Sequence, residues 1–77
     1  MRQSYSQRIL SFLFEQEQKN GNAVFNKSVA KRRFRNVEDV DGSVMRRARE
    51  LASNKMLRRV SVGSYALTVK GRRSVSN

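Results

Sequence analysis

Two arginines near the middle of the chain have the side chains and the spacing to bind a polyanion. Arg46 and Arg49 lie in the stretch "GSVMRRARELASNK". At 100° per residue on a helix, residues three apart point within about 60° of each other. A guanidinium group binds phosphate, and it can also donate to O6 and N7 of guanine together. If this stretch is a helix, the pair forms one basic face.

The same stretch carries an apolar face that would hold such a helix against a core. The apolar positions recur at i, i+4, i+7 and i+8: Val44, Ala48, Leu51 and Ala52. We therefore predict a helix over residues 42–54, with Glu50 placed to pair with one arginine. A solvated basic face on an ordinary helix would have this pattern too, so the helix alone does not decide between the two interpretations.

The overall charge favours a nucleic-acid partner. Seventeen Lys and Arg face six Asp and Glu, for a formal net charge of +11, and arginine outnumbers lysine twelve to five. Self-repulsion at this charge disfavours the compact state unless a polyanion neutralises it. Arginine is also the better residue for recognising phosphates and base edges.

The residue types that carry most enzyme chemistry are missing. The chain has no cysteine and no histidine, which removes disulfides, thiolate zinc sites and the commonest general base. The serines show no base beside them, and no phosphate-binding glycine loop occurs. We expect no enzyme activity, no cofactor and no metal.

Length and hydropathy indicate a single small domain over residues 1–77. No stretch approaches a membrane span, and the N-terminal apolar run is short and followed by acids, unlike a signal peptide. A cytoplasmic or nucleoid-associated location is therefore expected.

Helical patterns also fill the first half of the chain. Apolar spacing predicts a first helix over residues 4–19, ended by the stop signal Asn20-Gly21. Residues 23–25 suit a very short strand. Asn26 suits the N-cap of a second helix over residues 27–35.

One feature of these segments has two interpretations, and a second has one expected role. Leu10 and Phe14 form a ridge beside the main apolar stripe, which either contacts the rest of the fold or is a dimer or partner surface. The acidic segment around residues 38–41 precedes the predicted third helix. We expect Asp41 to cap that helix.

Apolar residues then alternate with polar or small ones with a period of two, which predicts a hairpin over residues 57–70. Gly63-Ser64 as the central pair of a type II′ turn would pair Val62 with Tyr65 and Val60 with Leu67. One face would collect the apolar side chains Val60, Val62, Tyr65, Leu67 and Val69. Residues 71–77 are expected to be a basic, flexible tail.

This order of elements resembles the winged helix-turn-helix fold of DNA-binding regulators. The stretch "SVMRRARELASNKML" looks like the recognition helix of MarR-like regulators, and "YALTVKGRR" is similar to the end of their wing. The resemblance covers residues 43–73. It implies an α+β winged helix-turn-helix domain with three helices, a short strand after the first helix and a C-terminal wing.

Three departures from the family limit what the resemblance implies. The family usually has glycine where Lys55 stands, so either Asn54 or Lys55 must take a left-handed conformation. The connection before the third helix is longer than usual. The long terminal dimerisation helices of many MarR-like proteins are absent from this sequence, so neither ligand sensing nor their dimer is implied.

The resemblance also implies how DNA would be held, with the third helix in the major groove. Base contacts are expected from Ser43, Met45, Arg46 and Arg49. Backbone contacts are expected from the flanking elements and the tail: Lys27, Lys31, Arg32, Arg47, Arg58, Arg59, Gly63, Ser64, Arg72 and Arg73. Phosphate contacts would position the protein, and base contacts would specify the site.

The preferred interpretation is a small, phage-like transcriptional regulator that binds double-stranded DNA. An architectural or recombination-accessory DNA-binding protein fits the same features. An RNA-binding module is less favoured, because the few aromatic residues look assigned to packing rather than to base stacking. A protein-binding adaptor or inhibitor would use the Leu10/Phe14 ridge or the acidic segment. A homodimer or a protein partner would enlarge the small DNA contact that one such domain offers.

Overall fold

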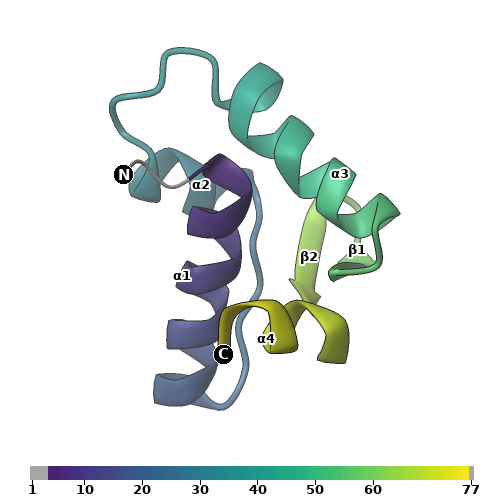
Figure 1. The fold of residues 1–77 in the computed structure, drawn as a ribbon. Helices are drawn as coiled ribbons and strands as arrows, with labels where there is room; N and C mark the ends of the chain where they lie inside the picture. Colours follow the sequence, from purple (N-terminus) through teal and green to yellow (C-terminus); the bar gives the residue numbers. More distant parts are fainter. Residues whose placement is uncertain (1–3, 77) are drawn as a thin grey trace.

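The computed structural model describes residues 4–76 and has an α+β architecture (Figure 1). The elements follow in the order α1 (Tyr5–Asn20), α2 (Lys27–Arg33), the π-helical turn η1 (Asp41–Met45), α3 (Arg46–Ser53), β1 (Leu57–Ser61), β2 (Ser64–Leu67) and α4 (Val69–Ser76). The α+β class is confirmed. Within these residues there are four α-helices instead of the three that were predicted.

The core lies where α1 meets α3, the hairpin and α4. Its largest fully buried side chains come from most elements: Phe25, Phe34, Ile9, Leu13, Leu57, Leu67 and Val44. Each such aliphatic or aromatic side chain contributes roughly 1.5–3 kcal/mol of hydrophobic stabilisation. Because the core draws on residues from Ile9 to Leu67, the elements between them form one packed unit.

Aromatic rings tie α1 and α2 together. Phe34 packs edge-on against Tyr5 and Phe25, with ring centroids 5.6 and 6.4 Å apart, and Phe12 meets Phe25 in the same way at 6.4 Å. Such contacts add to the area that the rings bury. The prediction that these aromatic residues serve packing is confirmed.

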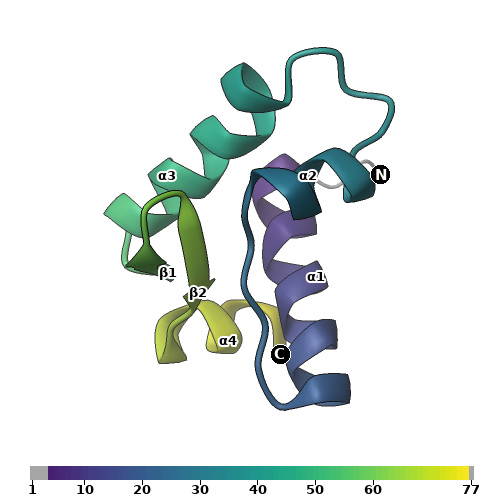
Figure 2. The ribbon, with the colours of Figure 1, turned by 180° about the vertical axis from the view of Figure 1, so that it is seen from behind.

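The predicted ends of the first two helices agree with the structure to within two residues. Gly21 ends α1 with a left-handed φ of 83°, and its N–H donates to the carbonyl of Glu17 over 2.8 Å. Asn26 caps α2, because its Oδ1 accepts a 2.9 Å hydrogen bond from the N–H of Val29. The predicted strand at residues 23–25 is reduced to a single bridge between Phe25 and Tyr65. In Figure 2 the segment that leads from α1 to α2 runs beside β2.

The cap of the third helical segment is Asp39, and the prediction that assigned it to Asp41 was wrong. The N–H of Gly42 donates to Asp39 Oδ1 over 2.9 Å. Helical structure begins at Val40, earlier than predicted, so the capping position falls on residue 39. The Asp41 carboxylate instead forms an ion pair with Lys27, at 2.8 Å.

The hairpin is present, but its predicted register was wrong. The pairs are Leu57↔Leu67, Arg58↔Ala66, Arg59↔Tyr65 and Ser61↔Ser64, with an irregularity between Arg59 and Ser61. The turn therefore uses Val62 and Gly63, and Gly63, with φ of 74°, takes the position where a type II turn requires positive φ. As a result Val60 and Val62 are exposed, and Ala66 is buried in their place.

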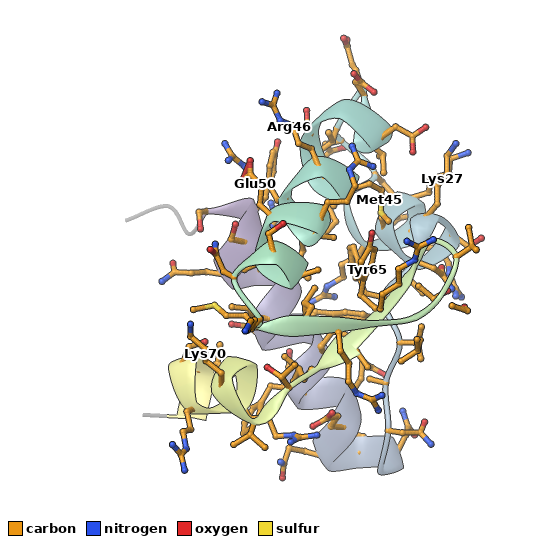
Figure 3. All side chains as sticks on the ribbon, turned by 90° about the vertical axis from the view of Figure 1, so that its right-hand side faces the viewer. Lys27, Met45, Arg46, Glu50, Tyr65 and Lys70 are labelled. Atoms are coloured by element: carbon orange, nitrogen blue, oxygen red, sulfur yellow. The ribbon has the colours of Figure 1, made fainter. Side chains whose placement is uncertain are left out.

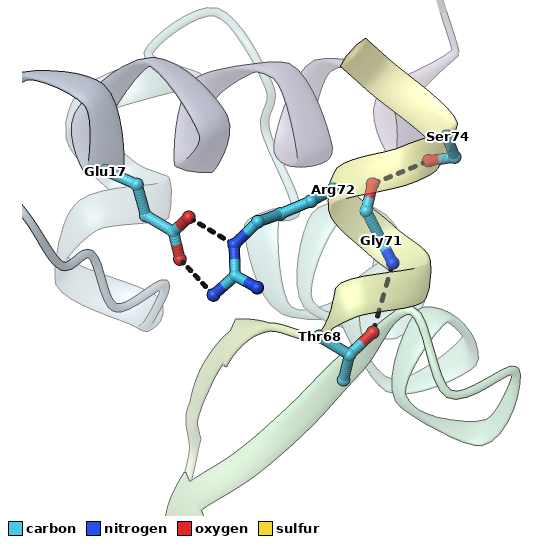
Figure 4. Close-up of polar contacts among 5 residues, drawn as sticks. All are labelled: Glu17, Thr68, Gly71, Arg72 and Ser74. Atoms are coloured by element: carbon cyan, nitrogen blue, oxygen red, sulfur yellow. Dashed lines mark hydrogen bonds and ion pairs between the residues drawn. The ribbon is translucent and has the colours of Figure 1, made fainter. Parts of the chain in front are cut away.

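The strands also end at Leu67 rather than at residue 70. Of the expected flexible tail, residues 71–76 belong to helix α4, and residue 77 lies outside the described residues. Thr68 caps this helix, since its Oγ1 accepts a 3.1 Å hydrogen bond from the N–H of Gly71 (Figure 4). Val69, predicted to lie on the apolar face of the hairpin, begins α4 and is 61% exposed.

Helix α4 packs against α1, and this decides between the two interpretations of the Leu10/Phe14 ridge. Leu10 is only 4% exposed and belongs to the core, and Phe14 is partly buried against it. Leu10 therefore contacts the rest of the fold, as the first interpretation predicts, and it is too buried for the alternative of a free partner surface.

Lys55 takes the left-handed conformation at the end of α3, with φ of 65°. Asn54, the alternative, has φ of −86°. The N–H of Lys55 donates to the carbonyl of Ala52 over 3.0 Å, and that of Met56 donates to Leu51 over 2.9 Å. This pair of bonds is a Schellman motif, whose left-handed position usually holds glycine.

We expect Lys55→Gly to raise the free energy of unfolding by about 0.5–1 kcal/mol. Glycine relieves roughly 1–2 kcal/mol of left-handed strain and loses about 0.5–1 kcal/mol in backbone entropy. Urea denaturation with an unchanged m-value would measure the gain. Asn54→Gly is the control and should lower stability, because residue 54 is not left-handed. A gain in the control but not at residue 55 would contradict the assignment.

Candidate nucleic-acid interface

Helix α3 presents two arginines to solvent from a firmly held backbone. Val44 and Ala48 are fully buried, which fixes the opposite face against the core. The Arg46 side chain is 71% exposed, and Arg49 is exposed as well. Figure 3 shows Arg46 on the outer side of α3. The structure thus brings the two expected base-reading arginines onto one outward helix face.

Glu50 pairs mainly with Arg47 rather than with the two outward arginines. Arg47 Nη1 lies 2.8 Å from Glu50 Oε1, whereas Arg46 Nε lies 3.9 Å from Glu50 Oε2. In the part of the chain that the structure describes, Arg49 forms no ion pair. The guanidinium of Arg47 is therefore oriented along the helix, whereas that of Arg46 meets Glu50 only at the longer distance and stays 71% exposed.

Met45 does not belong to this face, so its assignment to base contacts was wrong. It is only 5% exposed and packs in the core. It ends the wide π-helical turn η1, and both Val44 and Met45 face inward there. Ser43, one turn before Arg46 and Arg47, is partly buried and lines a shallow pocket with them.

The hairpin adds cations beside α3. Arg58 and Arg59 are both exposed on β1, and as neighbours on a strand they point to opposite faces of the hairpin. At the tip Gly63 is exposed and Ser64 is partly buried. The side chain next to them, Val62, is 86% exposed. The tip is therefore apolar, with arginines further back along the strand.

Helix α2, which contacts η1 just before α3, contributes a second set of exposed cations: Lys27, Lys31 and Arg32. Lys27 (labelled in Figure 3) lies beside the start of η1, where its Nζ contacts Asp41. Lys27 contacts that carboxylate, and the charges of Lys27, Lys31 and Arg49 lower its pKa.

Several other cations have structural partners, which sequence reasoning did not find. Arg72 donates to both carboxylate oxygens of Glu17, over 2.7 and 3.2 Å, and joins α4 to α1 (Figure 4). These hydrogen bonds, and then the charge of Glu17, raise the pKa of Arg72. The guanidinium groups of Arg8 and Arg33 lie over the rings of Phe34 and Phe12.

These contacts change the expected role of the C-terminal residues. Arg72 is a structural residue that holds α4 in place, and its expected contact with DNA is not part of the candidate interface. Arg73 is exposed, but it lies on α4, at the opposite end of the molecule from the start of α3 (Figure 1). The Nζ of Lys70 donates to the carbonyl of Asn54 over 3.1 Å, which stabilises the end of α3.

Residues 4–76 contain no group of acids that could hold a metal ion. Over the same residues, no helix has the length and apolar character needed to cross a bilayer. No protein-family model, no curated protein and no solved structure matches this chain. Evidence about function therefore comes from the geometry of α3, the hairpin and α2.

Proposed function

We propose that this protein binds double-stranded DNA as a winged helix-turn-helix domain, with α3 in the major groove and the hairpin as the wing. The observation that carries the proposal is the outward pair Arg46 and Arg49 on a helix whose other face is buried. Both side chains are available to donate hydrogen bonds to base edges or to phosphates.

The dimensions of the helical segment support this proposal. Residues 40–53 form one continuous helical stretch, which is about 21 Å long at about 1.5 Å per residue. The major groove is about 12 Å wide and admits one helix. α2 contacts η1 at the start of this segment and β1 contacts α3. Each of these neighbours has exposed cations for the phosphates that border the groove.

The biological role that fits best is a small transcriptional regulator in the cytoplasm or nucleoid. A domain of 77 residues buries limited DNA surface, so useful specificity calls for a dimer or a protein partner. The fourth helix and the long connection before η1 distinguish it from the plain three-helix form of the fold.

The hairpin tip favours an architectural role as the second candidate. Val62 is 86% exposed at the turn, and apolar side chains that enter the minor groove can unstack base steps and bend DNA. Energy transfer between dyes at the two ends of a short duplex would rise on binding if the protein bends DNA. An unchanged end-to-end distance would favour the regulator.

Titration of labelled nucleic acids across a salt series tests the main proposal. Duplex DNA is expected to bind more tightly than single-stranded DNA or duplex RNA. Its log affinity should fall linearly with log salt, by about 0.9 for each phosphate contacted. Fluorescence anisotropy would measure all three. Preference for RNA, or no salt-dependent binding to duplex DNA, would overturn the proposal.

A further inference from the structure

The acidic segment before α3 has one carboxylate that engages a cation directly. Asp41 Oδ2 lies 2.8 Å from Lys27 Nζ, across the junction of η1 and α2. Asp39, two residues earlier, uses its side chain to cap the helix instead. Within residues 4–76, neither Glu38 nor Asp39 forms an ion pair.

Asp41 lies among the cations that the proposed function assigns to DNA. The hydrogen bond from Lys27 lowers the pKa of Asp41, and the charges of Lys27, Lys31 and Arg49 lower it further. The carboxylate is therefore ionised at neutral pH and offsets part of the positive potential between α2 and α3. A phosphate approaching Lys27 would therefore also meet this negative charge.

The ion pair is open enough to be exchanged. The side chains of Lys27 and Asp41 are 54% and 59% exposed, and exposed pairs of this kind contribute little to stability. Both cation and carboxylate are therefore accessible to a competing anion, and opening the pair does not disturb the core. A DNA phosphate presents the same kind of charged oxygen to Lys27 that Asp41 does.

We propose that Asp41 competes with DNA phosphate for Lys27 and so limits the non-specific affinity of the proposed interface. In the free protein Asp41 holds Lys27. On DNA the phosphate takes its place, and Asp41 turns to solvent. The acidic segment thereby reduces the strength of binding to arbitrary sequence, where phosphate contacts supply nearly all of the affinity. This inference rests on the proposed DNA-binding function.

The test compares two single-charge variants on a random-sequence duplex. Asp41→Asn is expected to raise affinity about two- to fivefold, the range set by losing one exposed ion pair, and to steepen the salt dependence by up to about 0.9. Asp39→Asn removes the same charge two residues away, and asparagine preserves the cap. It should change both quantities by less than half as much.

A second pair of measurements shows whether Asp41 acts through Lys27. In a Lys27→Gln protein, Asp41→Asn should raise affinity by less than it does in the wild type, because the competition has been removed. If wild type binds duplex DNA but the two aspartate variants behave alike, the inference fails and the proposed function stands. If wild type binds no duplex DNA, both fail.

Discussion

Gly71→Ala is expected to destabilise the protein by about 1–3 kcal/mol, the usual cost of forcing an extra carbon into a packed site. A Cβ at residue 71 would lie 2.2 Å from the carbonyl oxygen of Met56 and 3.0 Å from Leu67 Cδ2. The first of these atoms belongs to the backbone, so a side-chain rotation cannot relieve the clash. Helix α4 would have to move away from the hairpin.

The Met56 carbonyl is fixed by its own contacts. It accepts a 3.2 Å hydrogen bond from the N–H of Thr68, and the N–H of Met56 donates to Leu51 at the end of α3. Thr68 Oγ1 also donates to the Lys55 carbonyl over 2.6 Å. The junction of α3, the hairpin and α4 is thus cross-linked by hydrogen bonds, and displacing α4 would strain or break them.

Thermal unfolding would measure this loss of stability. In a domain of this size, each kcal/mol lost lowers Tm by about 4–8 °C. Arg73→Ala, at an exposed position of the same helix, is the control and should change stability by no more than about 0.5 kcal/mol. A Gly71→Ala protein as stable as the control would show that α4 does not pack as described.

Local signals in the sequence were sufficient to predict the features that depend only on neighbouring residues. The cap at Asn26 and the stop at Gly21 each need only the adjacent turn of helix, and the apolar face of α3 needs only its own periodicity. Each of these features was predicted correctly because no distant residue changes it.

The features that were predicted wrongly depend on contacts between residues far apart in the sequence. α4 has a glycine and two serines in eight residues, a weak composition for a helix. It is held by its cap and by Glu17, which is 55 residues from Arg72 in the chain. The hairpin register was misjudged because an irregularity between Arg59 and Ser61 breaks the period of two on which the alternation depends.

The residues of the candidate site divide in the same way, into those that the local pattern placed correctly and those that it did not. The outward position of Arg46 and Arg49 follows from helical periodicity, which the structure retains. Met45 was misplaced because residues 41–45 form a π-helical turn, which changes the direction of the side chains within it. Nothing in the local pattern distinguished Arg72, which pairs with Glu17, from a cation such as Arg49, which forms no ion pair within residues 4–76.

Arg46→Ala/Arg49→Ala is expected to lower affinity for duplex DNA about thirtyfold or more at a preferred site. Each bidentate contact between arginine and a base contributes about 1–3 kcal/mol, so losing two costs about 2 kcal/mol or more. Both side chains are exposed, so the folded structure should survive, and far-ultraviolet circular dichroism would show this. Fluorescence anisotropy on a duplex selected from random sequence would measure the loss.

The control for this variant removes the same two charges elsewhere. Lys19 at the end of α1 and Arg73 on α4 are exposed and lie away from the start of α3 (Figure 1). Lys19→Ala/Arg73→Ala should therefore weaken binding only by long-range electrostatics, which salt screens beyond about 10 Å. Equal losses in the two double variants would mean that net charge alone holds the DNA, and α3 would lose its assignment as the helix that reads bases.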